Sequence, residues 1–124
     1  MNIKKEIKKL LEDRKLRLVF VRMDQKFYQE TFADLLSYNT KELEDRIVEI
    51  EAELKRMTNW KKTEKTEKRK AQLRQRYEKI QEFLDKVRGV RQALYNLSQK
   101  ERDLKEYIEF LEDFIKKERW KKLI

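Results

Sequence analysis

The sequence predicts an all-α protein, a helical bundle of four to five helices with long amphipathic members. Two observations predict this fold class. The 124 residues include one glycine and no proline, so the residues that make turns and hairpins are almost absent. Apolar residues recur three and four positions apart through most of the chain, which places them on one face of a helix. With 46% charged and 39% hydrophobic residues, such helices bury one stripe and expose the rest.

The first two helices are expected on either side of a short apolar stretch. Ile3, Ile7, Leu10 and Leu11 mark an amphipathic helix over the first dozen residues. The segment "KLRLVFVRM" departs from that pattern, so it is expected to be a short extended connector or the buried end of the same helix. Asp24 is predicted to cap a second helix, "DQKFYQETFADLLSYN", whose apolar face must be buried.

A heptad seam fills the middle of the chain. Asn39 and Glu42 resemble a capping box in front of it. Its apolar residues alternate steps of four and three, and they are Leu43, Ile47, Ile50, Leu54 and Met57. Residues 60–70 have no apolar stripe, and the seam that resumes at Leu73 is out of register with the first. A loop or a frayed turn is therefore expected within 60–70.

The last third of the chain is predicted to contain one more helix boundary. Gly89 lies inside the resumed seam and is expected to mark a bend or a close helix contact. Ser98 and Glu101 form a second capping box, which predicts a final helix beginning there. The inner face of that helix carries Leu104, Ile108, Leu111 and Ile115, widened by Tyr107, Phe110 and Phe114. No linker divides the chain, so residues 1–124 are expected to form a single helical domain.

Composition excludes several kinds of site. The chain has neither cysteine nor histidine, which removes disulfides and the usual ligands of zinc, iron and copper. It has no glycine loop for a nucleotide, and its carboxylates lie in mixed-charge runs that give no reason for shifted pKa values. We therefore expect no cofactor, no metal and no catalysis. No apolar run approaches the ~20 residues of a membrane span, so an intracellular protein without membrane contact is expected.

Cationic residues are in excess. The 33 lysines and arginines against 24 acids give a net charge of +9, which favours a polyanion or an acidic partner surface. The run "KKTEKTEKRK" is either a solvated loop or a basic loop that neutralises phosphates. In the second case the nucleic-acid contacts are Lys61, Lys62, Lys65, Lys68, Arg69 and Lys70.

Three stretches resemble the helical domain of GINS replication proteins. The segment "DQKFYQETFADLL" is similar to the D-x-x-F-Y opening of that family's second helix, and "RYEKIQEF" to the R-x-x-K-I stretch of a later helix. The segment "LSQKERDLKEYIEFLEDFIKKER" resembles its L-T-x-E-E … Y-x-x-I final helix. The resemblance implies a non-catalytic subunit of an archaeal-type or viral complex, located in the cytoplasm or nucleoid, or in the host cytoplasm if viral.

In that family the complex bridges the replicative MCM helicase, a nuclease-like partner and other fork proteins. Family members usually add a small β-rich domain, which the residues after Ile115 are too few to supply. The family-motif or interface positions implied by the resemblance are Phe27, Tyr28, Arg76, Lys79, Ile80 and Tyr107.

Helical periodicity gives these positions simpler roles. Phe27 and Tyr28 lie on a stripe that a helix must bury, so they are expected in the core. Arg76 and Lys79 lie off the apolar seam and are expected on a solvated face. Under the resemblance they pair instead with acids of neighbouring helices or subunits. The seam of Tyr77, Ile80, Leu84 and Val87 is then expected to pack against the Phe27–Tyr28 helix and the final helix.

Two functions remain open from the sequence. One is a DNA replication scaffold subunit resembling GINS, and the other is a small basic helical protein that binds nucleic acid without sequence preference. The apolar faces exceed what a chain of this size can bury, which predicts a homodimer, a homotetramer or assembly with related GINS-like subunits. A scaffold hides its apolar stripes against another helical protein, whereas a nucleic-acid binder is stable alone and shows steep salt dependence.

Overall fold

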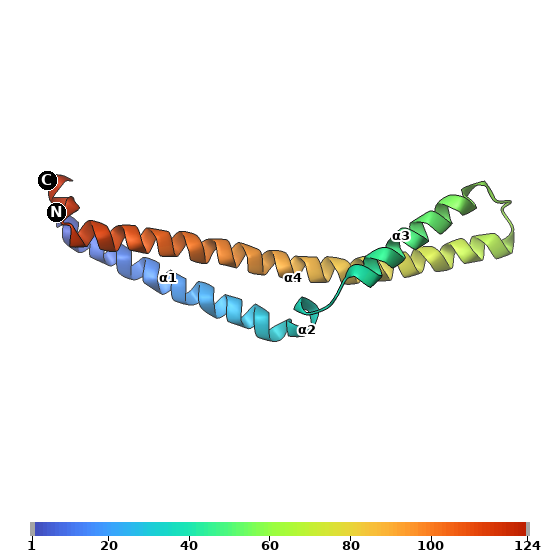
Figure 1. Ribbon diagram of the computed structural model, residues 1–124, viewed down its shortest axis with the longest axis horizontal. Helices are drawn as coiled ribbons and strands as arrows, with labels where there is room; N and C mark the ends of the chain where they lie inside the picture. The colour runs from blue at the N-terminus through green and yellow to red at the C-terminus, as the bar shows by residue number, and fades with distance from the viewer. Residues whose placement is uncertain (1, 124) are drawn as a thin grey trace. The chain divides into compact units, whose positions relative to one another are not determined.

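The computed structural model describes residues 2–123 and is all-α, which confirms the predicted fold class (Figure 1). Its helices are α1 (Ile3–Thr31), α2 (Ala33–Leu36), α3 (Lys41–Arg56) and α4 (Glu64–Lys116). Two short 3₁₀ segments, η1 (Met57–Asn59) and η2 (Arg119–Leu123), complete the described chain. None of the helices within residues 2–123 combines the length and the apolar content that a membrane span requires.

Two compact units make up the fold, and α4 contributes to both. Unit 1 contains the residues up to Ala33 and those from Gln92 onward, so it pairs α1 with the second part of α4. Unit 2 is Asp34–Arg91, in which α3 lies along the first part of α4 (Figure 1). The helices run antiparallel in each unit, because the order of the ion pairs between them is reversed. These pairs are Lys15–Glu112 and Arg22–Glu101 in unit 1, and Glu53–Arg69 and Glu44–Arg88 in unit 2.

Helix α1 runs without a break through residues 15–23, where the sequence predicted a change of pattern. The predicted helix start at Asp24 is wrong, because Asp24 lies inside α1. The positions that α1 buries or half-buries keep one helical spacing across this stretch, through Leu18, Val21 and Tyr28. Valine costs a helix only a few tenths of a kcal/mol relative to alanine, by rough propensity scales. With no glycine or proline to end it, the helix continues.

Helix α4 likewise continues through the second predicted capping box. Ser98 and Glu101 lie inside α4, so the predicted helix start there is wrong. Glu101 does not cap a helix; its carboxylate forms ion pairs with Lys105 at 3.1 Å and with Arg22 of α1 at 3.7 Å. The apolar seam on either side of Ser98 keeps its spacing, so nothing in the packing requires the chain to turn.

Gly89 is an interior residue of α4. A Cβ placed there would meet no heavy atom within 4 Å beyond its own helix surroundings. The predicted close helix contact at this position is therefore wrong. Gly89 faces open space, and its main effect is to weaken the helix by about 1 kcal/mol relative to alanine.

The predicted capping box does not form at the start of α3, because the N-cap is Thr40 and not Asn39. The Oδ1 atom of Asn39 accepts a hydrogen bond from the backbone N–H of Lys41 at 3.1 Å. Glu42 points forward along the helix and accepts from Arg46 at 3.0 Å, so it does not complete the box. The loop or turn predicted within 60–70 is confirmed and is short: residues 60–63 lie between η1 and α4, which begins at Glu64.

Each unit has a small apolar core. In unit 2, Ile50, Met57 and Leu73 are buried together, and Leu54, Tyr77 and Ile80 pack against them. Leu84 and Val87 are buried farther along α4. Tyr77 and Ile80 therefore pack with residues of α3 and η1, whereas the Phe27–Tyr28 segment, which the resemblance implied as their partner, belongs to unit 1. In unit 1 the buried side chains are Leu18, Ile108 and Leu111.

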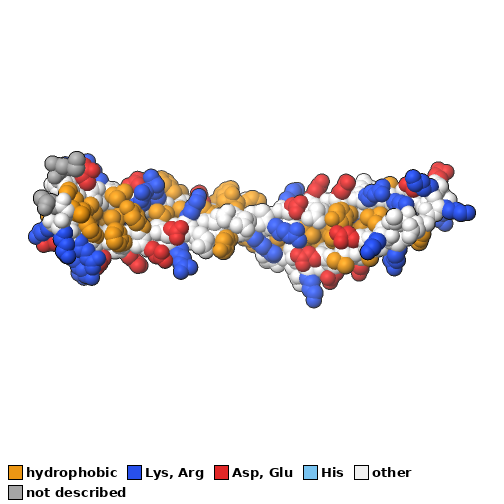
Figure 2. All heavy atoms as spheres, turned by 90° about the horizontal axis from the view of Figure 1, so that it is seen from above, with side chains coloured by type: hydrophobic (Ala, Val, Ile, Leu, Met, Phe, Trp, Pro, Cys, Tyr) orange, Lys and Arg blue, Asp and Glu red, His pale blue; other side chains and the backbone are white. Residues whose placement is uncertain are grey.

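Helix α1 carries a second apolar face, which its own unit leaves exposed. This α1 outer stripe consists of Leu16, Phe20, Met23 and Phe27, each 54–59% exposed. The prediction that Phe27 is a core residue is wrong, whereas Tyr28 beside it is half-buried, with the two ring centroids 5.8 Å apart. Figure 2 shows hydrophobic side chains in large patches on the surface of unit 1.

Candidate nucleic-acid interface

Net positive charge is concentrated where α3 and α4 are joined. Residues 55–76, called the basic tip below, hold ten lysines and arginines and two glutamates, which is a net +8 out of the chain's +9. The ten cations are Lys55, Arg56, Lys61, Lys62, Lys65, Lys68, Arg69, Lys70, Arg74 and Arg76. The basic tip comprises the end of α3, η1, the connecting loop and the first turns of α4. Figure 2 shows Lys and Arg side chains gathered at this end of unit 2.

Buried side chains pack at the base of the basic tip and hold it in place. Met57 and Leu73 are 1% and 2% exposed and pack with Ile50, so η1 is held against α4. Beside this cluster, Arg69 donates from Nη2 and Nε to Oε1 of Glu53, at 3.2 and 3.3 Å. The loop between the helices is therefore anchored at both ends.

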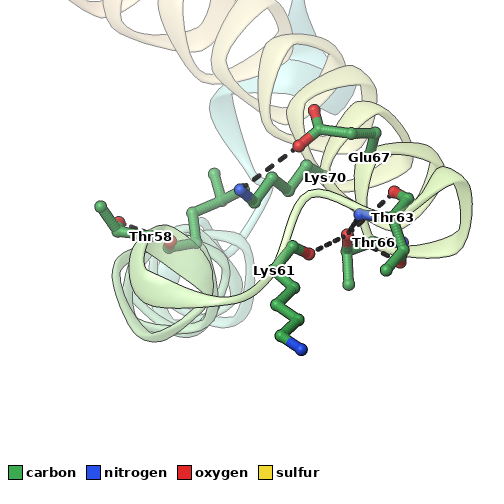
Figure 3. A network of polar contacts seen from close by, with 7 residues as sticks. Thr58, Lys61, Thr63, Thr66, Glu67 and Lys70 are labelled. Atoms are coloured by element: carbon green, nitrogen blue, oxygen red, sulfur yellow. Dashed lines mark hydrogen bonds and ion pairs between the residues drawn. The ribbon is translucent and has the colours of Figure 1, made fainter.

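Two threonines shape the loop and begin α4 (Figure 3). The backbone N–H of Thr66 donates to the hydroxyl of Thr63 at 3.2 Å, and the N–H of Thr63 donates to the hydroxyl of Thr66 at 2.9 Å. This reciprocal arrangement is that of a capping box. The Thr66 hydroxyl also donates to the carbonyl oxygen of Lys61 at 2.8 Å. These local bonds start the helix at Glu64 and place the Lys61 backbone against its first turn.

Trp60 lies in the loop directly before Lys61 and Lys62. Its backbone is extended, with φ −78° and ψ 150°, and its N–H donates to the carbonyl oxygen of Met57 at 3.2 Å. The side chain is 54% exposed, although a tryptophan gains much from burial where a core is within reach. Exposed aromatic rings beside cations are the two components of surfaces that bind single-stranded nucleic acid.

The six cations that the sequence predicted as contacts fall into two groups. Four of them, Lys61, Lys62, Lys65 and Lys68, are exposed and form no ion pair with any residue in 2–123. The other two are already engaged. Arg69 is bound to Glu53, and Lys70, whose side chain is only 12% exposed, lies 3.7 Å from the carboxylate of Glu67 (Figure 3).

Folding adds residues that the analysis of the sequence missed. Lys55 and Arg56 end α3, and Arg74 lies one turn beyond Lys70 on α4; all three are exposed. They and Trp60 lie outside the 61–70 run in the sequence, so the charge of that run does not predict them. Counting charge over the loop and two helical turns on each side of it would have found them, since a hairpin brings both helix ends together.

The six family-motif positions are divided between the units. Arg76, Lys79 and Ile80 line a groove between α3 and α4, opposite Glu49 and Glu53. Arg46 and Arg69 line the same groove, and Glu53 is already paired with Arg69, so Arg76 and Lys79 form no ion pair within residues 2–123.

Tyr107 belongs to unit 1, as Phe27 and Tyr28 do. The guanidinium of Arg14 lies over the Tyr107 ring at 5.5 Å, and the Phe110 ring stacks on it at 6.4 Å between centroids. Three of the six family-motif positions therefore belong to unit 1 and three to unit 2.

One titratable side chain below the basic tip has a perturbed pKa. The Tyr77 hydroxyl donates to Oε1 of Glu51 across the two helices at 3.3 Å. The negative charge of Glu51, followed by partial loss of hydration and by the hydrogen bond itself, raises the pKa of the Tyr77 phenol above its ordinary 10.0. Because only the neutral phenol can donate this bond, Tyr77 joins α3 to α4 throughout the neutral range.

The arrangement at the basic tip can attract phosphate groups and offer an aromatic face to a base. Within the described residues, no cluster of three or more His, Cys, Asp or Glu side chains is placed to hold a metal ion. Comparison of the chain with protein-family models, with curated proteins and with solved structures finds no match.

Proposed function

We propose that this protein is a non-catalytic helical scaffold that binds nucleic acid without sequence preference through its basic tip. One observation carries the proposal: residues 55–76 hold a net +8 at the anchored end of a helical hairpin. Only two of the ten cations there, Arg69 and Lys70, are paired with carboxylates in the described residues. The other eight are available to an external polyanion.

A polyanion is the partner that such a surface fits. Cations held this close repel one another, and phosphates relieve that repulsion while releasing condensed counterions. Six of the ten cations are lysines, which act as flexible point charges on phosphates and do not read base edges. These features support binding that depends on salt and not on sequence.

Trp60 supports a preference for single strands. Bases of a single strand are free to stack on an exposed indole, whereas those of a duplex are already stacked on each other. Lys61 and Lys62 follow Trp60 directly, so a strand whose base stacks on Trp60 brings its neighbouring phosphates to these two cations.

The test is a titration of fluorescent single- and double-stranded DNA and RNA with the full chain over a range of salt concentrations. The variant K61Q/K62Q/K65Q/K68Q removes four exposed, unpaired cations of the basic tip. We expect weaker binding to every sequence, and a salt slope reduced by up to about 3.6, because each of the four lost phosphate contacts contributes roughly 0.7–0.9. Circular dichroism should show unchanged helicity.

The matched control is K5Q/K8Q/K9Q/K122Q, which removes four exposed cations of unit 1. It lowers the net charge by the same amount, so it separates a local site from a general charge effect. Equal weakening by both variants would contradict a site at the basic tip, and full binding by the basic-tip variant would exclude it.

A second candidate function is the replication scaffold implied by the GINS resemblance. The α1 outer stripe favours it, because an exposed apolar helix face supplies a docking surface for another helical protein. The resemblance remains a prediction, and the helix starts expected at Asp24 and Ser98 are interior positions. Co-elution of the full chain with a replicative MCM helicase, lost in a variant with glutamates in the stripe, would support this function. Separate elution at micromolar concentrations would count against it.

A further inference from the structure

We propose that the α1 outer stripe is the contact surface of an antiparallel homodimer, in which α1 packs against α1 of a second copy. This inference does not rest on nucleic-acid binding at the basic tip. It assigns a surface and an orientation to the self-association that the composition predicts.

The spacing of the stripe is that of a coiled-coil seam. Leu16, Phe20, Met23 and Phe27 are separated by steps of four, three and four, which is the alternation of d and a positions in a heptad. Their side chains are 54–59% exposed, whereas Leu18 and Val21, about half a turn away around the helix, are buried and half-buried. Helix α1 therefore has two apolar faces, one covered by its own unit and one open.

The open face is complementary to itself when two copies run antiparallel. A two-fold axis between Phe20 and Met23 places Phe20 opposite Met23 of the second copy, and Leu16 opposite Phe27 of the second copy. Each layer then combines one ring with one aliphatic side chain. A parallel pair would instead place ring against ring at Phe20 and at Phe27.

Charges beside the stripe are complementary in the antiparallel pair. Arg17 and Asp24 occupy e positions, and e residues face e residues of the partner in an antiparallel pair, so Arg17 meets Asp24 of the second copy twice. In a parallel pair e faces g, which leaves Asp24 beside Val19 and places Arg17 beside Glu12, so the two orientations differ in the partner of Arg17. Arg17 currently contacts Asp13 of its own helix at 3.1 Å, and both groups are exposed, so Arg17 is free to change partner.

The first experiment measures the mass of the full chain in solution by sedimentation velocity from micromolar to several hundred micromolar concentrations. We expect a dimer whose fraction rises with concentration, and a monomer at all concentrations for F20E/M23E. Both positions are exposed, so this variant should keep its helicity by circular dichroism. The control V48E/Y95E places two glutamates at exposed apolar positions outside the stripe and should remain dimeric.

A monomeric wild type, or an F20E/M23E variant that still dimerises, would overturn the assignment of this surface. Loss of the dimer in the control as well would show a non-specific effect of added charge and would also overturn it. A monomer that binds a different protein through the stripe would make the occupant a partner and not a second copy.

Cysteine cross-linking then tests the orientation, since the chain has no cysteine of its own. We expect a mixture of L16C and F27C chains to form a cross-linked heterodimer with a short bismaleimide, while each variant alone does not. Efficient cross-linking of F27C to itself would show a parallel pair and overturn the antiparallel arrangement.

A charge exchange gives an independent readout. R17D and D24R should each weaken the dimer, by several-fold in dissociation constant, because each brings like charges together. The double variant R17D/D24R should restore it in an antiparallel pair. Failure of the exchange to restore the dimer, with helicity unchanged, would contradict the proposed contact between these two residues.

Discussion

Arg69 on α4 donates two hydrogen bonds, at 3.2 and 3.3 Å, to one carboxylate oxygen of Glu53 on α3. The pair crosses between the helices beside the buried cluster of Ile50, Met57 and Leu73. It holds the two arms of the hairpin together at the base of the basic tip. It also neutralises one of the cations that would otherwise face an external polyanion.

Replacing Glu53 with glutamine should therefore strengthen nucleic-acid binding. The change releases Arg69, raises the net charge of unit 2 by one and should steepen the salt slope by roughly 0.7–0.9. The pair is 42% and 33% exposed, so its loss should lower the free energy of unfolding by only about 0.2–1 kcal/mol. The matched control is E42Q, which frees Arg46 from its 3.0 Å contact at the other end of α3. An E53Q chain that binds no better than E42Q would show that Arg69 does not reach the nucleic acid.

Trp60 should contribute to single-strand binding because its ring stacks on a base, and not because it stabilises the fold. W60A is expected to weaken single-strand affinity by about 1–3 kcal/mol, whereas W60F should retain much of it because phenylalanine also stacks. In a W120F background the remaining tryptophan emission comes from Trp60 alone, so its quenching by unlabelled DNA reports the contact directly. Equal affinities for W60A and the wild type would remove stacking from the proposal.

Leu73 should be a sensitive position of the core next to the basic tip. It is 2% exposed, and L73A leaves a cavity that is expected to cost about 2–5 kcal/mol of unfolding free energy. Ile80 is half-buried at the edge of the same cluster, so I80A should lower the free energy of unfolding by less than L73A does. V48A is the control, because Val48 is 63% exposed and should change stability by no more than about 0.5 kcal/mol. Urea unfolding followed at 222 nm measures all three, and similar values for L73A and V48A would contradict the core described above.

Gly89→Ala should stabilise the protein by about 0.5–1 kcal/mol. A glycine inside a helix carries excess backbone freedom in the unfolded chain, and the added methyl group meets no heavy atom within 4 Å. Ala71→Gly, at an exposed position of the same helix, should have a similar effect of opposite sign. A destabilising G89A would show that Gly89 serves a contact or a bend that the isolated chain does not display.

Tyr77 should ionise at a higher pH than an ordinary tyrosine. Glu51 raises the pKa of its phenol above 10.0, so the folded chain holds the proton more tightly than the unfolded chain. The stabilising effect is complete below the ordinary pKa and is lost as the pH rises through the raised value. Absorbance at 295 nm follows tyrosine titration, and Y77F should remove the component that is raised above 10.0. E51Q should return that component towards the ordinary value, and an E51Q profile identical to the wild type would contradict this pairing.

Some features of the interface follow from the sequence and others depend on contacts. The charge of the 61–70 run and the seam of α3 could be predicted, because both are properties of neighbouring residues. Which cations are free to bind an external polyanion could not be predicted. Arg69 and Lys70 look equivalent to Lys68 in the sequence, yet Glu53 from another helix and Glu67 from the preceding turn engage them. Only the hairpin brings Lys55 and Arg56 to the same end as Lys61 and Lys62.

The sequence by itself determined the all-α fold, because a chain with one glycine and no proline has almost no means to turn and its apolar residues repeat at helical spacing. Only the tertiary structure decided where the helices end. Asp24, Ser98 and Glu101 carry the side chains of helix caps, yet they lie inside α1 and α4. A cap stabilises a helix start by about 1 kcal/mol, whereas a continuous seam buries several apolar side chains at about 1.5–3 kcal/mol each. Burial of apolar side chains along an antiparallel partner helix therefore outweighs the effect of the cap residues, and both helices continue past them.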